Sequence, residues 1–419
     1  MLQTPAKQSN EPSPGGRKEP ALSRPVDAPA GRGLDWFNLF VANIQTGFGP
    51  FIAVYLSGQS WTQTAIGVAL SIGTVTSMAS QVPAGALVDA LANKTRVAAF
   101  SVLVFTASAL MFAVHPIPLL VYLAEILHGV SSCTLGPAIA AMSLALAGSY
   151  GMALRLGRNA RYAAVGNGLG AALMGACGQY VSERAVFYLT AALTLPALAA
   201  LLPLRRFAVA RGAADPACAE EHPSVLRVLA DRRLLIFCGC AMLFTFANSP
   251  MLVLMSGTMT AKVGNPSLLI AACIVLPQII VALASPAVGR FADRRGRRLV
   301  LIVSFAVLPL RALILSTTAS PALLIGVQIL DGIAAAGFGI MVPLIVSDVA
   351  ARSGHFNLCL GAVGFAIGIG STLSTSAAGW VADRLGMRPA FCFLAGVGLA
   401  AALLALFAMP ETRPQPRGD

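Results

Sequence analysis

Twelve predominantly apolar stretches run along this chain, each close to the roughly 20 residues that an α-helix needs to cross a bilayer. They lie near residues 36–57, 64–88, 97–114, 118–147, 161–180, 185–203, 234–256, 267–288, 299–318, 321–348, 357–379 and 389–409. Only 11% of all residues are charged, whereas a soluble domain carries about 25%. The sequence therefore predicts an all-α membrane protein with twelve transmembrane helices.

Three short segments occur twice, about 200 residues apart. The pairs are 83–89 with 286–293, 125–129 with 328–332, and 159–170 with 357–368, at offsets of 204, 203 and 198. Six apolar stretches precede the polar segment 204–233 and six follow it. Paired halves in a very apolar chain are typical of membrane transporters whose substrate binds between the repeats. We therefore expect two pseudo-symmetric six-helix bundles.

These boundaries divide the chain into five parts. We predict a disordered cytoplasmic tail at 1–33, bundles at 34–203 and 234–410, a cytoplasmic linker at 204–233, and a short tail at 411–419. Within the linker, residues 225–229 are compatible with a short interfacial helix and equally with a solvated loop.

Lysine and arginine residues are distributed unevenly between the predicted loops. If the N-terminus is cytoplasmic, 24 of the 29 fall in cytoplasmic segments, four fall in outside loops, and Arg311 falls within a span. Basic residues accumulate on the cytoplasmic side of membrane proteins. We therefore predict a multi-pass protein of a bacterial-type inner membrane with both termini inside. The net charge of +12 then reflects topology and does not indicate nucleic-acid binding.

No motif in the chain indicates an enzyme or a cofactor. Seven of the eight cysteines fall in apolar spans and none forms a CxxC pair, so they are expected to pack as small apolar residues. Metal-ligand clusters, phosphate-binding loops and nucleotide-binding glycine patterns are missing from the sequence. The expected partners are a small-molecule substrate, the lipid bilayer and protons. We expect a monomer, with uphill transport driven by an ion gradient.

A recognisable motif lies between the eighth and ninth spans, and reads Gly289-Arg-Phe-Ala-Asp293-Arg294-Arg-Gly296-Arg297-Arg298. It resembles the loop signature of the major facilitator superfamily. A partial copy between the second and third spans keeps Gly85 and Asp89 but has Ala90 and Ala92 where Arg and Gly are expected. The ending Pro410-Glu-Thr-Arg413 also resembles a common end of the twelfth span.

The resemblance implies that these motif residues latch the two halves together in the outward-facing state. It places Asp293 at the start of the fifth span, near Arg158 and Asn159, and Asp89 at the start of the eleventh span, near Asn357. We expect the stronger effect from Asp293, because Asp89 lacks the local arginine. The alternative is that these arginines merely follow the positive-inside rule.

Four ionisable residues fall inside predicted spans, where each costs about 2.5–3.5 kcal/mol on insertion scales. Glu125 and His128 share one face of the fourth span, Asp331 lies in the tenth, and Arg311 lies near the outer end of the ninth, where it could snorkel. Because His128 and Asp331 occupy equivalent positions in the two halves, we expect them to face each other across the cavity and to carry protons.

Uncharged polar residues add further candidates for the cavity wall. Asn43, Gln45, Asn248 and Gln328 either line the cavity or bond helix to helix. Related drug exporters usually carry R-x-x-Q-G in the fourth span, whereas this chain has Glu125-Ile-Leu-His128-Gly129. The acid in place of the arginine leaves the coupling mechanism open.

The sequence thus favours a secondary transporter, with proton-coupled efflux of a small organic compound as the first interpretation. Proton-coupled uptake of a metabolite uses the same parts and remains an alternative. A membrane receptor or partner protein that binds without transporting is a further alternative of a different class. If Glu125 and Asp331 dominate the cavity charge, neutral or cationic substrates are favoured over anions.

Overall fold

Every regular element in the described part of the chain is an α-helix. The computed structural model describes residues 28–46, 50–59, 61, 63–114, 116–204, 225–260, 267–318, 320–351 and 354–413. The predicted all-α fold is therefore confirmed within these ranges. Most of the predicted N-terminal tail and of the linker lies outside the described residues.

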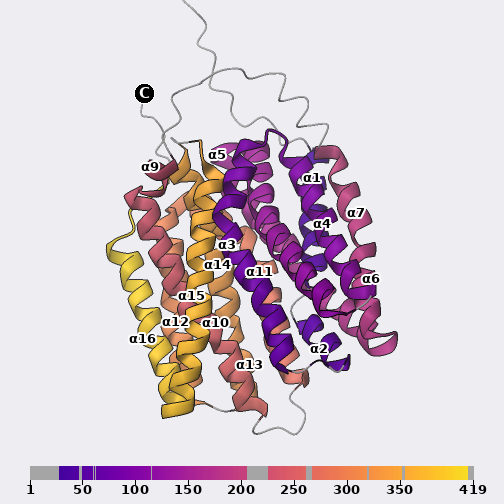
Figure 1. Ribbon diagram of the computed structural model, residues 1–419. Coiled ribbons are helices and arrows are strands. Elements are labelled where there is room, and N and C mark those ends of the chain that lie inside the picture. Colours follow the sequence, from indigo (N-terminus) through magenta and orange to yellow (C-terminus); the bar gives the residue numbers. More distant parts are fainter. Residues whose placement is uncertain are drawn as a thin grey trace, which may run out of the picture.

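The helices form two groups in chain order (Figure 1). The first group is α1 (Ala28–Thr46), α2 (Pro50–Gly58), α3 (Gln63–Ala90), α4 (Lys94–Val114), α5 (Pro118–Tyr180), α6 (Glu183–Ala192) and α7 (Thr194–Ala200). The second is α9 (Val225–Leu229), α10 (Arg232–Thr260), α11 (Ser267–Arg295), α12 (Arg297–Thr317), α13 (Pro321–Gly326), α14 (Gln328–Ala350), α15 (Phe356–Leu385) and α16 (Met387–Phe407). We call the two groups the N-half and the C-half.

Each predicted span coincides with one or two of these helices. Among the described residues, nine helical segments are long and apolar enough to cross a membrane. The long helix α5 contains the predicted fourth and fifth spans, separated at Gly148, whose backbone is left-handed with φ of 64°. The fifth span therefore begins about a dozen residues before its predicted start at residue 161.

Three boundaries differ from those expected from sequence. Helix α1 begins at Ala28, inside the predicted tail 1–33. Residues 225–229 form the short helix α9, which decides between the two interpretations of that segment. Residues 411–413, assigned to the C-terminal tail, pack on the C-half: Glu411 accepts a hydrogen bond from the N–H of Arg297, and Arg413 donates one to the carbonyl of Arg294.

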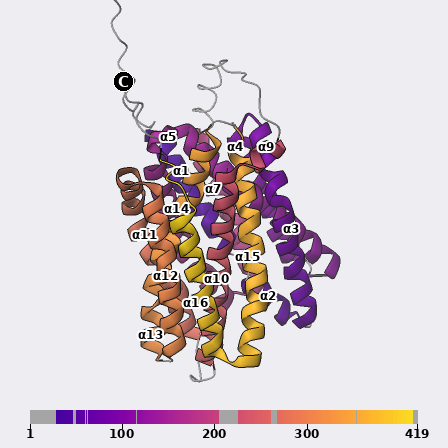
Figure 2. The same ribbon diagram turned by 90° about the vertical axis from the view of Figure 1, so that its left-hand side faces the viewer.

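The turns with basic residues gather at one end of the molecule, which we call the basic end. The α3–α4 and α11–α12 turns lie there, near α9 (Figure 1 and Figure 2). The short helix α13 and the α15–α16 turn lie at the opposite end (Figure 1). The α3–α4 turn of the N-half and the equivalent α11–α12 turn of the C-half therefore lie at the same end of the molecule.

Glycines bring the two halves into backbone contact near the basic end. A side chain at Gly85 of α3 would collide with the carbonyl of Asn357 in α15, and one at Gly361 would collide with the carbonyl of Gln81. Gly289 of α11 stands in the same relation to the carbonyl of Ala153 in α5. Close helix approach in membranes depends on small residues at the contact. These two helix pairs, α3 with α15 and α5 with α11, therefore define the interface between the halves.

A buried ion pair joins α1 to the start of the fifth span. Asp35 accepts hydrogen bonds from Arg155 and Arg158, and the side chains of Asp35 and Arg155 are 1% and 4% exposed. Arg155 also donates to Asn159 Oδ1 at 2.8 Å and to the carbonyl of Gly31 at 3.2 Å. Because a carboxylate and further hydrogen-bond acceptors surround Arg155, the free-energy cost of burying its guanidinium charge is offset.

We expect Asp35→Asn to lower the free energy of unfolding by about 3–5 kcal/mol, because it leaves Arg155 as a buried charge without its carboxylate. Arg158→Gln is the matched control. It removes the other ion pair of Asp35, but the Arg158 side chain is 48% exposed, so the loss should be about 0–1 kcal/mol. Chemical unfolding in detergent measures both, and equal losses would contradict this account.

Candidate transport site

Two connected chambers lie between the halves. The larger, of about 530 Å³, is bounded by α3 and α5 on the N-half side and by α15 on the C-half side. The second, of about 380 Å³, lies between α5, α14 and α15. Both are lined by Gln81, Ser132 and Ile367, so these three residues form the boundary between the chambers. Volumes of this size are typical of small-molecule sites.

Glu125 and His128 line the larger chamber from α5. The Glu125 side chain is only 3% exposed, and its Oε2 lies 3.6 Å from His128 Nδ1. Gly73 of α3 provides the room for this carboxylate, because a Cβ there would collide with Oε2. The other oxygen, Oε1, is buried and has no hydrogen-bond partner among the described residues. The imidazole of His128 packs edge-on against Phe105, with 5.0 Å between the ring centroids.

Arg311 organises a second polar cluster inside the C-half. Its Nη1 donates to Asp331 Oδ1 and to Asn248 Oδ1, each at 2.6 Å, and its Nη2 donates to Gln328 Oε1 at 2.9 Å. The Arg311 side chain is 1% exposed, so it does not snorkel as the sequence suggested. The cluster ties α10, α12 and α14 together, and its one positive and one negative charge cancel.

The predicted apposition of His128 and Asp331 is not what the structure shows. Facing Glu125 and His128 across the larger chamber are Ile367, Gly368, Ser371 and Thr372 of α15, whereas Asp331 binds Arg311 within its own half. The physical reason is that a carboxylate removed from water needs a cation and hydrogen bonds close by. Arg311 provides both, and the sequence offered no indication of its inward direction.

The four uncharged candidates do not line these two chambers either. Asn248 and Gln328 are partners of Arg311 and do not line either chamber. Asn43 is 3% exposed and donates to the carbonyl of Leu39, where Gly170 of α5 packs against it. Gln45 is exposed on α1. Of the residues predicted to line the cavity, Glu125 and His128 are therefore the two that the described structure places on a chamber wall.

Asp89 connects the halves at the basic end. Its Oδ1 accepts from the backbone N–H and the side-chain amide of Asn357, at 3.0 and 2.6 Å, and its Oδ2 accepts from the N–H of Leu358 at 2.8 Å. These N–H groups belong to the first turn of α15, where a carboxylate also interacts favourably with the helix dipole. Asp89 therefore lies at Asn357, as the family resemblance implies.

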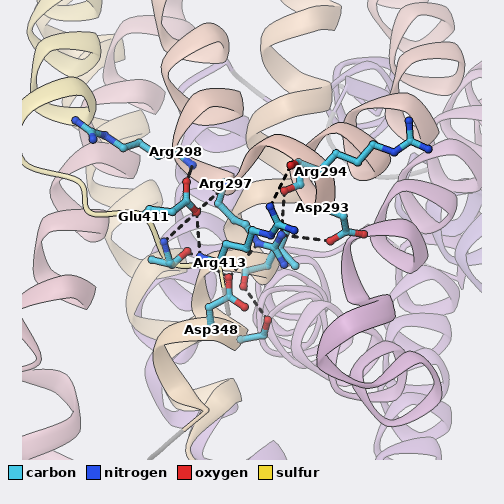
Figure 3. Close-up of polar contacts among 11 residues, drawn as sticks. Asp293, Arg294, Arg297, Arg298, Asp348, Glu411 and Arg413 are labelled. Atoms are coloured by element: carbon cyan, nitrogen blue, oxygen red, sulfur yellow. Dashed lines mark hydrogen bonds and ion pairs between the residues drawn. The ribbon is translucent and has the colours of Figure 1, made fainter. Parts of the chain in front are cut away.

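Asp293 makes different contacts from those expected. It pairs with Arg297 at 3.2 Å, four residues further along the chain (Figure 3). Arg158 and Asn159 belong to the cluster around Asp35. These two expected neighbours were wrong because the fifth span begins near Gly148, so that both residues lie further along it. Between Asp89 and Asp293, only Asp89 forms hydrogen bonds between the halves among the contacts described.

The complete copy of the loop motif is held within the C-half. Arg297 is 3% exposed and bonds Asp348 of α14 at 3.2 Å as well as Asp293 (Figure 3). Glu411 accepts from the backbone N–H groups of Arg297 and Arg298, at 2.9 and 3.2 Å, and so caps α12. Gly296 has φ of 98° and would collide with Glu411 if it carried a side chain, so only glycine fits there.

Two further arginines at this end bind backbone carbonyls. Arg413 donates to the carbonyl of Arg294 at 3.0 Å, and Arg298 of the motif donates to that of Leu406. Sequence reasoning missed Asp35, Asp348 and Glu411 as partners of this basic end. Each is an acid at the end of an apolar span, a position that could have marked it as a counterion.

The described residues hold no group of three or more His, Cys, Asp or Glu side chains suited to a metal ion. What they do hold is a pair of helical halves that enclose a chamber, with an acid and a histidine on its wall. That arrangement is typical of membrane transporters that move small solutes between two repeats.

Comparison with known proteins agrees with this class. The family model of the Major Facilitator Superfamily matches residues 36–256 and 234–419. The chain is 35% identical over 390 residues to an uncharacterized MFS-type transporter of Mycobacterium tuberculosis, covering 91% of this chain and 93% of that protein, in each of two strains. This chain belongs to the major facilitator superfamily and is a multi-pass membrane transporter.

A solved structure shares the fold. The human organic anion transporter MFSD10 (TETRAN) superposes with a TM-score of 0.64 at 16% identity, covering 91% of this chain and 98% of that one. At this identity the similarity shows the fold alone. The resemblance recognised from the loop motif is confirmed.

The contacts reverse the expected order of the two loop acids. We expect Asp89→Asn to weaken closure of the basic end by about 1.5–3 kcal/mol, roughly ten- to hundredfold in the conformational equilibrium, because charge-assisted hydrogen bonds across the halves are lost. Distances between spin labels at Ala92 and Arg232, which lie on different halves at this end, would report the closed fraction. Asp293→Asn is the matched control and should leave this fraction nearly unchanged. A larger shift for the control would restore the order expected from sequence.

Proposed function

We propose that this protein is a proton-coupled exporter of a small organic compound, working by alternating access in a bacterial-type cytoplasmic (inner) membrane. The observation that carries the proposal is Glu125. It is a buried acid next to His128 on the wall of a chamber between the halves, and one of its oxygens has no hydrogen-bond partner among the residues that the structure describes. An ionisable group kept at such a position in a membrane protein marks a proton or substrate path.

The two groups suit coupling because a carboxyl and an imidazole can each bind and release a proton. A proton on Glu125 removes the negative charge that would hold a cationic substrate. Proton binding and substrate binding then exclude one another at one position, which links the proton gradient to transport. The Arg311–Asp331 pair plays no part in this step and serves to hold the C-half together.

We place the basic end in the cytoplasm, as the lysine and arginine distribution favours. The halves are then in contact on the cytoplasmic side, where Gly85 and Gly289 meet the opposite half. In this state the chamber would receive protons from outside. The latch predicted for Gly85, Asp89, Gly289, Asp293, Arg294, Gly296, Arg297 and Arg298 is proposed in a divided form. Gly85, Asp89 and Gly289 hold the two halves together, whereas Asp293, Arg294, Gly296, Arg297 and Arg298 hold the loop within the C-half.

We expect Glu125→Gln to abolish transport driven by a pH gradient in proteoliposomes while substrate exchange without a gradient persists. The amide fills the same space but cannot exchange a proton. His128→Gln should shift the pH dependence of transport without abolishing it. Asp383→Asn, an exposed acid at the end of α15, is the control and should leave both unchanged.

The outcomes of this experiment separate the candidate functions. Gradient-driven transport that survives in Glu125→Gln would place the proton route elsewhere. Accumulation in the direction of proton flow would show the symport alternative. If a compound that binds the purified protein is never translocated, the non-transporting receptor would be the correct class.

Substrate charge follows from the same geometry. Because Arg311 neutralises Asp331, the acid that remains on the chamber wall is Glu125, and an anion there would add repulsion to its desolvation. We expect an amine to be transported faster than its neutral analogue, and the neutral analogue faster than the matched carboxylate. Faster transport of the carboxylate would contradict this expectation. It would favour organic anions as the substrate class, as in the name of the solved structural neighbour.

A further inference from the structure

A third cavity lies on the outer face of the N-half, away from the transport chambers. It is a groove of about 520 Å³ between the end of α3, the first half of α4, and α5. Its walls are apolar and include Leu91, Phe100 and Val130, whose side chains are 42%, 68% and 40% exposed. Along α4 it extends from Arg96 to Val104, which is about 12 Å of helix and most of the roughly 15 Å hydrocarbon depth of one leaflet.

The hydroxyl groups of Ser101 and Thr134 at the floor of this groove are already hydrogen-bonded to other protein atoms. Ser101 donates to the carbonyl of Val97 at 2.9 Å, and its Oγ lies 2.6 Å from Thr134 Oγ1. Thr134 in turn is bonded to the carbonyl of Ser131 at 2.9 Å. Because these hydroxyls already have partners within the helices, the surface is effectively apolar and suits a hydrocarbon chain.

The end of the groove at the basic end is positively charged. Arg96 is exposed there and has no ion pair among the described residues. Its backbone N–H is bound by Asn93 Oδ1 at 3.1 Å, which fixes the first turn of α4 next to the groove. Lys94 does not compete for an anion with Arg96, because its Nζ is bound to carbonyls at the end of α3.

The repeat within the chain supplies a comparison. Helices α4 and α12 have equal lengths and start 203 residues apart, so Arg96 corresponds to Leu299 and Thr134 to Gly337. At Gly337 the Ser304 side chain of α12 packs directly onto α14, and a Cβ would collide with it. In the N-half, Ser101 takes the place of Ser304, and its hydroxyl meets the side chain of Thr134. The arginine at the groove is a feature of the N-half, because Leu299 stands at the equivalent position of the C-half.

We propose that the groove between α3, α4 and α5 binds one anionic phospholipid, with an acyl chain along Phe100 and Val130 and the phosphate at Arg96. The bilayer surrounds this face, so a lipid is the occupant always present at high concentration. The charge of the arginine selects an anionic head group, and such lipids are enriched in the cytoplasmic leaflet. A bound lipid here would brace the end of α3, whose Asp89 connects the two halves.

The test measures lipid binding to the purified full-length protein in detergent by native mass spectrometry and thermal unfolding. The probes are phosphatidylglycerol, phosphatidylcholine with the same acyl chains, and inorganic phosphate. We expect phosphatidylglycerol to bind about fivefold more tightly than phosphatidylcholine, since one basic side chain near a membrane surface contributes about 1 kcal/mol. Arg96→Gln should bring the two lipids to equal affinity, and Val130→Trp should weaken both by filling the groove.

Arg295→Gln is the matched control, because it removes an exposed positive charge at the basic end but outside the groove. It should keep the fivefold preference. Equal binding of both lipids to the unaltered protein would overturn the proposal, as would an equal loss of preference in Arg295→Gln. Stabilisation by inorganic phosphate alone to the same extent would show an anion site without a lipid, and would also overturn it.

Discussion

The architecture depends on how charges are compensated inside a chain that is mostly apolar. A charge withdrawn from water is stable only with a counterion and hydrogen bonds close by. Asp35 with Arg155, Asp331 with Arg311, and Asp348 with Arg297 meet this requirement, and each pair ties together helices that are separate in sequence. Within the described parts of the chain, the ion-pair partner of Glu125 is His128 at 3.6 Å, and one carboxylate oxygen of Glu125 has no hydrogen-bond partner. The incompletely compensated acid is the one on the chamber wall, which is where a transporter can use it.

Two halves built on one plan have diverged in how they use equivalent positions. Asp89 caps α15 of the other half, whereas Asp293 pairs within its own loop. The intact loop motif is held by Glu411 and Asp348, so the complete motif stabilises the C-half itself. The eroded copy keeps Asp89, an acid that binds the other half. An alternating-access protein benefits from such asymmetry, because contacts between halves must break in each cycle while contacts within a half must persist.

Much of the fold could be predicted because the bilayer restricts the choice to helices, and their lengths and number follow from apolar runs. The start of the fifth span could not, since Gly148 interrupts a helix that no proline or charge marks in sequence. The candidate site was recovered in part. Glu125 and His128 lie together on the chamber, whereas Asp331, Asn248 and Gln328 surround Arg311. The missing information was the rotation of the ninth and tenth spans, which depends on packing between helices.

The sequence by itself determined the class: apolar runs and a recurring loop motif define a two-bundle transporter, because both are local properties that can be read along the chain. Only the tertiary structure decided which charges meet. Asp89 and Asn357 lie 268 residues apart, and Asp35 and Arg155 lie 120 apart, so no local pattern specifies either contact. Helix rotation in a membrane follows from side-chain packing and pairing with neighbours. Arg311 neutralises Asp331 and so leaves Glu125 as the acid on the chamber wall. This division of the acids is a property of the folded protein alone.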